Sequence, residues 1–166
     1  MAERDLDDVD RLVNQWTAER PDLDVRAMAT VARLLNVATR IRERLTAFAA
    51  EYGVSVPEAD VLFTLRRSGP PYRLSPTAIA DALLVPSGTM TNRLDRLERQ
   101  GLIERVPHPT DRRSMEVELT DHGRHVVDDA VTRHVDNEEE MLAPLTERER
   151  ATLDRLTAKL LQHLAT

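Results

Sequence analysis

The short polar side chains between residues 87 and 92 are the group in this sequence best suited to chemistry. They open a predicted helix and comprise Ser87, Gly88, Thr89, Thr91 and Asn92. Hydroxyl and amide groups of this length hydrogen-bond to the edges of DNA bases, and glycine lets a backbone approach closely. The dipole and free amides at a helix start favour phosphate. The segment therefore predicts a helix that enters the major groove of double-stranded DNA.

Four arginines extend this prediction beyond the first turn. Arg96 and Arg99 lie further along the same predicted helix, where they could meet phosphate. Arg112 and Arg113 end the turn-rich stretch from Pro107 to Arg113, which joins two segments of period-two alternation. Such a hairpin tip can place arginine in the adjacent minor groove. We therefore expect the helix and the loop at 107–113 to grip two neighbouring grooves.

The distribution of charge supports this location, although the chain as a whole is acidic. Net charge is −6, but residues 86–113 carry six cations and four acids, whereas residues 114–166 carry six cations and twelve acids. Local potential matters more than total charge for binding nucleic acid. Aromatic residues make up only 3% of the chain, which disfavours single-strand binding by base stacking.

The pattern of elements predicts a mainly α fold, a winged helix-turn-helix with N- and C-terminal dimerisation helices. Apolar spacing and caps indicate helices near 6–16, 24–51, 55–67, 75–84, 87–100, 120–141 and 146–164, with a hairpin at 103–105 and 115–119. We expect three regions: N-terminal helices for dimerisation and ligand binding (1–50), the winged helix-turn-helix (55–120) and C-terminal dimerisation helices (121–166). The leucine stripes of the outer helices predict a homodimer that reads a pseudo-palindrome with half-sites about one DNA turn apart.

The stretch from Leu74 to Gly123 resembles the MarR family of bacterial transcription regulators. The matching segments are LSPTAIADAL, VPSGTMTNRLDRLERQGLIERV and DRRSMEVELTDHG. The resemblance implies that Asp111 pairs with Arg113 to stiffen the wing, while Arg112 contacts the minor groove. Many relatives carry arginine where Asn92 stands; asparagine suits adenine better than guanine, so the operator should differ at that base.

A narrower resemblance links the chain to a urate-responsive branch of that family, which has an extra N-terminal helix. Trp16, Asp60 and Arg93 occupy the positions that line an anionic ligand site in that branch, and other members respond to aconitate or citrate. The resemblance implies that an anion competes with Asp60 for Arg93 and shifts the recognition helix. Ligand and DNA would then weaken each other's binding. The expected function is a repressor released from a palindromic operator by a small anionic metabolite.

Each of these residues also has a structural interpretation that leaves the effector open. Trp16 can pack on an amphipathic stripe, Asp60 can favour a helix dipole, and Arg93 can contact phosphate. The winged helix could also serve as a helical protein-interaction module that does not bind DNA.

Other chemistries have little support in the sequence. There is no cysteine, which excludes disulfides and thiol switches, and no phosphate loop or hydrolase motif, so we expect neither an enzyme nor a cofactor. His122 and His125 have a metal-binding spacing, with His134 further along, but solvent-exposed histidines and no metal site are expected. Glu138–Glu140 is interpreted as a solvated face. The acidic N-terminus and the lack of a long apolar stretch predict a cytoplasmic protein with no membrane partner.

Overall fold

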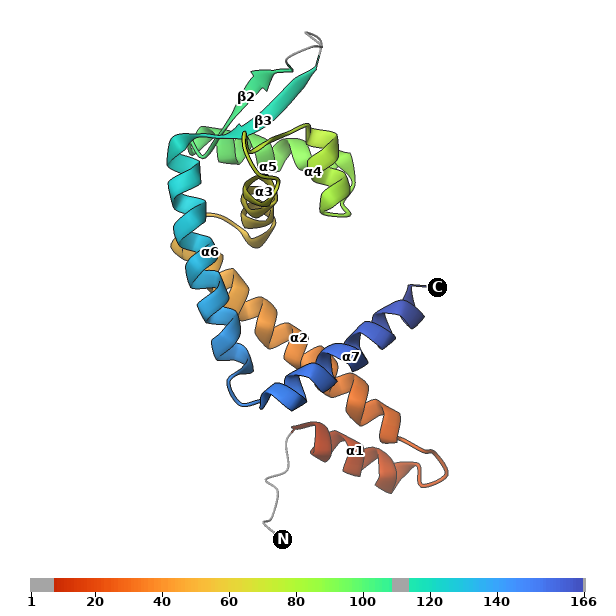
Figure 1. Cartoon of the computed structure of the whole chain (residues 1–166). Helices are drawn as coiled ribbons and strands as arrows, with labels where there is room; N and C mark the ends of the chain where they lie inside the picture. Colours follow the sequence, from red (N-terminus) through yellow and green to blue (C-terminus); the bar gives the residue numbers. More distant parts are fainter. Residues whose placement is uncertain (1–7, 109–113, 166) are drawn as a thin grey trace. The chain divides into compact units, whose positions relative to one another are not determined.

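The computed structural model describes residues 8–108 and 114–165, and the chain divides into two units, one ending at Ala47 and one beginning at Phe48. Figure 1 labels the elements, which are α1 (Asp8–Glu19), α2 (Arg26–Glu51), α3 (Val56–Arg67), β1 (Arg73–Leu74), α4 (Pro76–Ala82), α5 (Ser87–Arg99), β2 (Ile103–Pro107), β3 (Met115–Leu119), α6 (Asp121–Leu142) and α7 (Glu147–Leu164). The expected mainly α fold is confirmed. None of the described helices has the length and apolarity needed to cross a membrane.

The first unit consists of α1 and most of α2. Val9 on α1 and Val25 just before α2 are buried, and Asp10 forms an ion pair with Arg33 across the two helices. Most of the remaining large apolar side chains here stay exposed. The helix expected from Leu6 onward begins at Asp8 in the described residues.

Side-chain caps start most helices of the second unit where the sequence places them. The hydroxyl oxygens of Ser75 and Thr120 accept hydrogen bonds from the backbone amides of Ala78 and Gly123, at 3.1 and 2.9 Å. Thr146 begins α7 with a capping box, in which its backbone amide donates to Glu149. Such caps satisfy amides that have no partner within the helix.

Helix α5 begins without a side-chain cap. Pro86 occupies the N-cap position and Ser87 is the first helical residue. Proline supplies a fixed φ at this position but no side-chain acceptor. The α4–α5 connection is therefore held by its backbone rather than by a serine cap.

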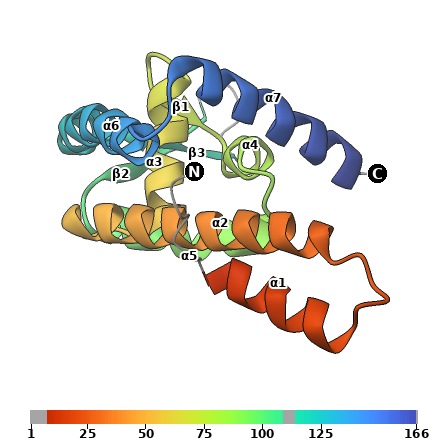
Figure 2. The same cartoon turned by 90° about the horizontal axis from the view of Figure 1, so that it is seen from below.

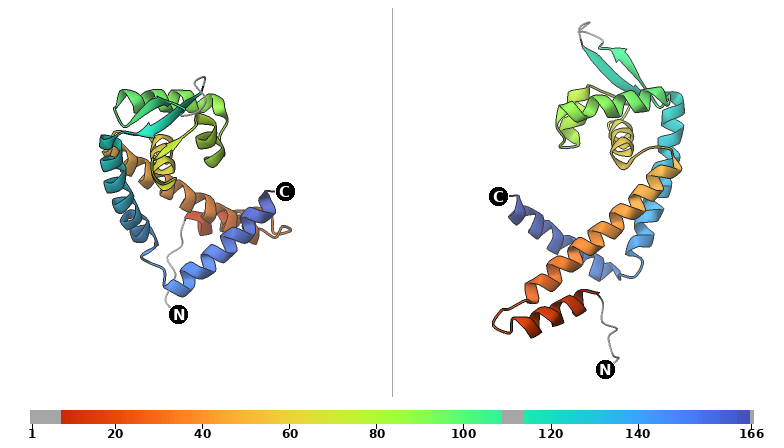
Figure 3. Two further views of the ribbon diagram at one scale, coloured as in Figure 1. Left: turned by 45° about the horizontal axis from the view of Figure 1, so that its top comes forward. Right: turned by 180° about the vertical axis from the view of Figure 1, so that it is seen from behind.

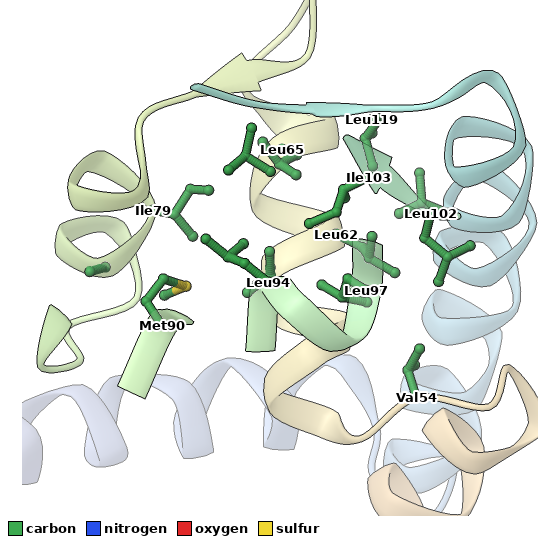
Figure 4. Close-up of a cluster of buried hydrophobic side chains, with 14 of the residues drawn as sticks. Val54, Leu62, Leu65, Ile79, Met90, Leu94, Leu97, Leu102, Ile103 and Leu119 are labelled. Atoms are coloured by element: carbon green, nitrogen blue, oxygen red, sulfur yellow. The ribbon is translucent and has the colours of Figure 1, made fainter. Parts of the chain in front are cut away.

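The core of the second unit is centred on α3, which lies between α4 and α6 (Figures 1 and 2). Val61 and Leu65 of α3 are fully buried, as are side chains of the helices and strands around them. Figure 4 shows this cluster, whose largest buried members are Leu65, Ile79, Met90, Leu94, Leu97, Ile103, Val61, Val117 and Val127. One contiguous core therefore holds α3, α4, α5 and the sheet together.

The sheet has three antiparallel strands in the order β1-β3-β2, one more than the hairpin predicted from the sequence. In the added strand, Arg73 lies opposite Glu118, and their side chains pair at 2.5 Å. This short strand joins the segment before α4 to the hairpin.

Gly123 is buried and lies in the first turn of α6. A Cβ atom at this position would lie 1.8 Å from the carbonyl oxygen of Leu102. That same oxygen accepts a hydrogen bond from the amide of Thr120 at 3.2 Å. A side chain here would therefore push α6 away from the start of β2.

We predict that Gly123→Ala lowers the free energy of unfolding by roughly 2–4 kcal/mol, because backbone atoms cannot give way as a flexible side chain can. Gly88→Ala is the matched control. A Cβ at position 88 meets nothing within 4 Å, so alanine should be neutral or stabilising by up to about 1 kcal/mol. Urea unfolding of both variants measures the difference; equal stabilities would contradict the close approach.

Candidate nucleic-acid interface

Helix α5 has one buried face and one exposed face. Met90, Leu94 and Leu97 recur at helical spacing and are almost completely buried. The opposite face presents residues predicted to bind DNA. The exposed residues there are Gly88, Thr89, Thr91, Asn92, Arg96 and Arg99. An α-helix with its side chains is about 10–12 Å across, which fits the major groove of about 12 Å width. The fold therefore turns the predicted base-reading residues to the outside.

Hydrogen bonding constrains what the first turn of α5 can offer. The hydroxyl of Thr89 donates to the carbonyl oxygen of Pro86 at 2.8 Å. Its oxygen keeps acceptor capacity toward the outside. Thr89 is thus suited to accept a hydrogen bond, while the amide of Asn92 can both donate and accept.

Arg105 on β2 connects the hairpin to α5, a role that the sequence reasoning missed. Its guanidinium contacts Asp95 at 2.5 Å and also forms an ion pair with Glu98. The hydrogen bond that Arg105 donates to the Asp95 carboxylate is the main cause of a raised Arg105 pKa. Figure 3 shows the hairpin beside α5. Arg105 therefore aligns the hairpin with α5 and offsets part of the negative charge of two carboxylates on that helix.

Arg96 lies between the outer face of α5 and the start of α3. Its Nη1 atom is 3.6 Å from Oε1 of Glu58, although the Arg96 side chain remains 63% exposed. Burial raises the pKa of Glu58, but hydrogen bonds from Ser55 and the charge of Arg96 outweigh it and hold this pKa below its usual value. Glu58 is therefore charged and lies beside Arg96. The contact of Arg96 with phosphate stays a prediction.

The expected wing contacts lie beyond the residues that can be placed. Asp111, Arg112 and Arg113 fall in the undescribed stretch 109–113. Ser87 begins α5, but its side chain is likewise not described. Their assigned roles stay predictions.

Arg93 lies near enough to Asp60 for its positive charge to act on that carboxylate. Asp60 on α3 is exposed, yet neighbouring atoms displace enough of its water to raise its pKa. The positive charges of Arg93, Arg67 and His134 act in the opposite direction and only partly offset this rise. The sequence reasoning did not place Arg67 and His134 near Asp60. Arg67 lies at the end of α3 and His134 lies on α6, so their approach depends on the folded structure. The assignment of Asp60 and Arg93 to an anion site stays a prediction.

The predicted ligand residue Trp16 and the three histidines differ in their exposure. Trp16 lies on α1 in the first unit and is 43% exposed. His122 and His125 are exposed as expected, whereas His134 is half-buried between the rings of Phe48 and Phe63, at centroid distances of 5.6 and 5.3 Å. The expectation of an exposed His134 was therefore wrong, because the aromatic side chains of α2 and α3 pack around it.

Acidic and histidine side chains form no metal-binding cluster in the described part of the chain. Glu138 and Glu139 are exposed and pair with His134 and Arg150, respectively. These contacts fit a solvated helix face stabilised by ion pairs.

Helices α3, α4 and α5 followed by the β2–β3 hairpin define a winged helix-turn-helix. Sequence comparison leads to the same class: the profile of the MarR family matches residues 52–114. The HTH-type transcriptional regulator PecS of Dickeya dadantii is 41% identical over 157 residues, which cover 95% of each chain. The chain belongs to the MarR family of transcriptional regulators.

Further relatives support both the family and the fold. The multiple antibiotic resistance protein MarR of Salmonella typhimurium is 31% identical, covering 79% of this chain and 90% of its own. A crystal structure of a MarR mutant from E. coli complexed with operator DNA is 27% identical, with a TM-score of 0.69, and covers 82% of this chain and 97% of that one. AbsC of Streptomyces coelicolor shares the fold, with a TM-score of 0.75 and 19% identity. The match covers 86% of this chain and 97% of that one. The named relatives are regulators, not enzymes.

We predict that Arg105→Gln lowers the free energy of unfolding by about 0.5–1.5 kcal/mol, because it removes two partly buried ion pairs. The matched control is Arg40→Gln, which removes a pair with Glu43 whose arginine is 83% exposed. That change should have almost no effect on stability. Chemical denaturation of both variants measures the effect. If the free energy of unfolding of Arg105→Gln equals that of the unaltered protein, Arg105 does not connect the hairpin to the helix.

Proposed function

We propose that this protein is a homodimeric repressor that binds a palindromic operator and is released by a small anionic metabolite. One observation carries the DNA-binding part: α5 packs on the core through an apolar stripe and presents short polar side chains outward, with the hairpin held beside it by Arg105. The relative crystallised with operator DNA supports this reading of the fold.

Exposed apolar side chains support pairing with a second copy. Apolar side chains that are more than a third exposed occur along the N-terminal helices and α7, which fits the proposed dimerisation regions 1–50 and 121–166. They include Leu12, Met28, Val31, Leu35, Val37, Ile41, Leu153, Leu156, Leu160, Leu161 and Leu164. Apolar surface on this scale marks an interaction surface. A two-fold dimer would present two copies of α5 to half-sites about one helical turn apart.

Each protomer would read DNA with two elements. Thr89, Thr91 and Asn92 would contact base edges in the major groove, with Gly88 allowing close approach and Ser87 contributing at the helix start. Arg96 would contact phosphate, and Arg112, stiffened by an Asp111–Arg113 pair, would enter the minor groove. The first group would set sequence preference, whereas the arginines would supply affinity and salt dependence.

The effector would bind around Arg93, with Trp16 supplying an aromatic surface. A urate-like or an aconitate- or citrate-like anion would compete with Asp60 for the Arg93 guanidinium, and the positive charge of Arg67 would favour the anion. Because Arg93 belongs to α5, its change of partner acts on the recognition helix. Linkage then requires that effector binding weaken DNA binding, and the reverse.

We predict that the logarithm of operator affinity falls linearly with the logarithm of salt concentration. Arg112→Ala should weaken binding to all duplexes and reduce the slope by about 1. Replacing Thr89, Thr91 or Asn92 by alanine should instead cost about 1–3 kcal/mol on the operator and little on random DNA.

Fluorescence anisotropy over a range of salt concentrations measures these effects. Negligible binding by the unaltered protein at low salt would favour a protein-interaction module. Equal losses on operator and random duplexes would contradict the base-reading assignment of the α5 residues.

We predict that urate, citrate or trans-aconitate raises the melting temperature. An effector at about 100 times its Kd adds about 2.7 kcal/mol, or roughly 5–10 °C for a chain of this size. Trp16→Ala and Arg93→Ala should abolish the shift. Asp60→Asn removes the competing carboxylate, so it should keep effector binding but lose effector-driven release from DNA.

Arg99→Ala serves as the matched control, because it removes an exposed arginine from the same helix. This variant should keep the full thermal shift. Normal effector responses in all three pocket variants would contradict the proposed effector site. The proposal that the protein binds DNA would still stand.

A further inference from the structure

Leu84, in the connection between α4 and α5, combines two unusual properties. Its side chain is 93% exposed, the most exposed large apolar side chain among the described residues. Its backbone has a φ of +53°, a left-handed conformation that residues with a Cβ atom rarely adopt. Neither property favours leucine over glycine or a polar residue.

The backbone conformation follows from how α4 ends. The amide of Leu84 donates to the carbonyl of Asp81 at 3.2 Å, and the amide of Val85 donates to that of Ala80 at 3.0 Å. These two bonds form a Schellman motif, in which the left-handed residue is usually glycine. Leucine therefore occupies a glycine position at a cost to backbone energy.

The surrounding residues hold this leucine outward. Leu83 and Val85, on either side, are partly buried and pack against the core. Pro86 then restricts the backbone and accepts the hydroxyl hydrogen bond of Thr89. Leu84 is thus presented on a well-held turn, three residues before α5 begins, and ordering it on contact costs little entropy.

The charge of this region indicates what kind of contact Leu84 can make. Residues 76–92 contain one acid, Asp81, and no lysine or arginine. No cationic side chain of this segment can therefore pair with phosphate, whereas apolar contact with deoxyribose and thymine methyl groups is available to Leu84. In a helix-turn-helix the first helix crosses the DNA backbone and the second enters the groove, so the turn between them lies next to the DNA.

We propose that Leu84 is a DNA-contacting residue that packs against a deoxyribose or thymine methyl group at the edge of each half-site. The contact rests on the DNA binding proposed above. It extends the interface beyond α5 and the wing, and it adds affinity that does not depend on salt. Leucine is then favoured at a strained position because its side chain is needed in the complex.

Leu84→Gly tests this with two measurements that should change in opposite directions. Operator affinity should fall about three- to tenfold, as expected for uncovering part of a leucine side chain. The loss should be equal at every salt concentration, because no phosphate contact is removed. The melting temperature of the free protein should rise by about 2 °C, because glycine relieves the left-handed strain.

Two further variants separate the side chain from the backbone. Leu84→Ala keeps the strain and should lose affinity without gaining stability. Leu84→Met keeps an apolar side chain of similar reach and should bind like the unaltered protein.

Unchanged operator affinity in Leu84→Gly would overturn the proposal and leave a protein partner as the occupant of this surface. A loss that grows or shrinks with salt would overturn it as well, because it would point to an altered phosphate contact. Failure of the unaltered protein to bind duplex DNA would instead be a failure of the proposed function.

Discussion

The packing of α5 on α3 is the interaction on which the rest of the site depends. Met90, Leu94 and Leu97 form a narrow buried stripe, and burying each such side chain contributes about 1.5–3 kcal/mol. Because the stripe is narrow, it fixes the rotation of α5 about its own axis, and with it the direction of Thr89 and Asn92. A slip by one residue would turn these polar groups by about 100° and bring polar side chains toward the core.

The same packing places α5 between two sets of charges. On the hairpin side, Arg105 pairs with carboxylates of α5, and on the α3 side Arg96 contacts Glu58 and Arg93 lies near Asp60. The recognition helix is therefore held on both sides by electrostatic contacts that depend on local charge. In the function proposed above, an anion at Arg93 would act on one of these sets and so link effector binding to DNA release.

Much of the fold could be predicted because its signals are local. Apolar periodicity and serine or threonine caps, such as Ser75, located the helices to within a few residues. The alternating strands located the hairpin. The misses depend on partners distant in the sequence: β1 has two residues and no periodicity, and the pairing of Arg105 with Asp95 needs the strand folded back on the helix. The burial of His134 and the tight contact at Gly123 likewise exist only once α6 has packed.

The central claim is that the outer face of α5 lies in the major groove. The chain has no cysteine, so Arg99→Cys, at an exposed position of α5 that has no proposed base contact, introduces a single attachment point for an iron chelate that cleaves nearby DNA. We predict two clusters of operator cleavage about one helical turn apart, and none from Thr132→Cys, an exposed position on α6. Cleavage that is equal for the two positions, or spread evenly along the duplex, would contradict the account.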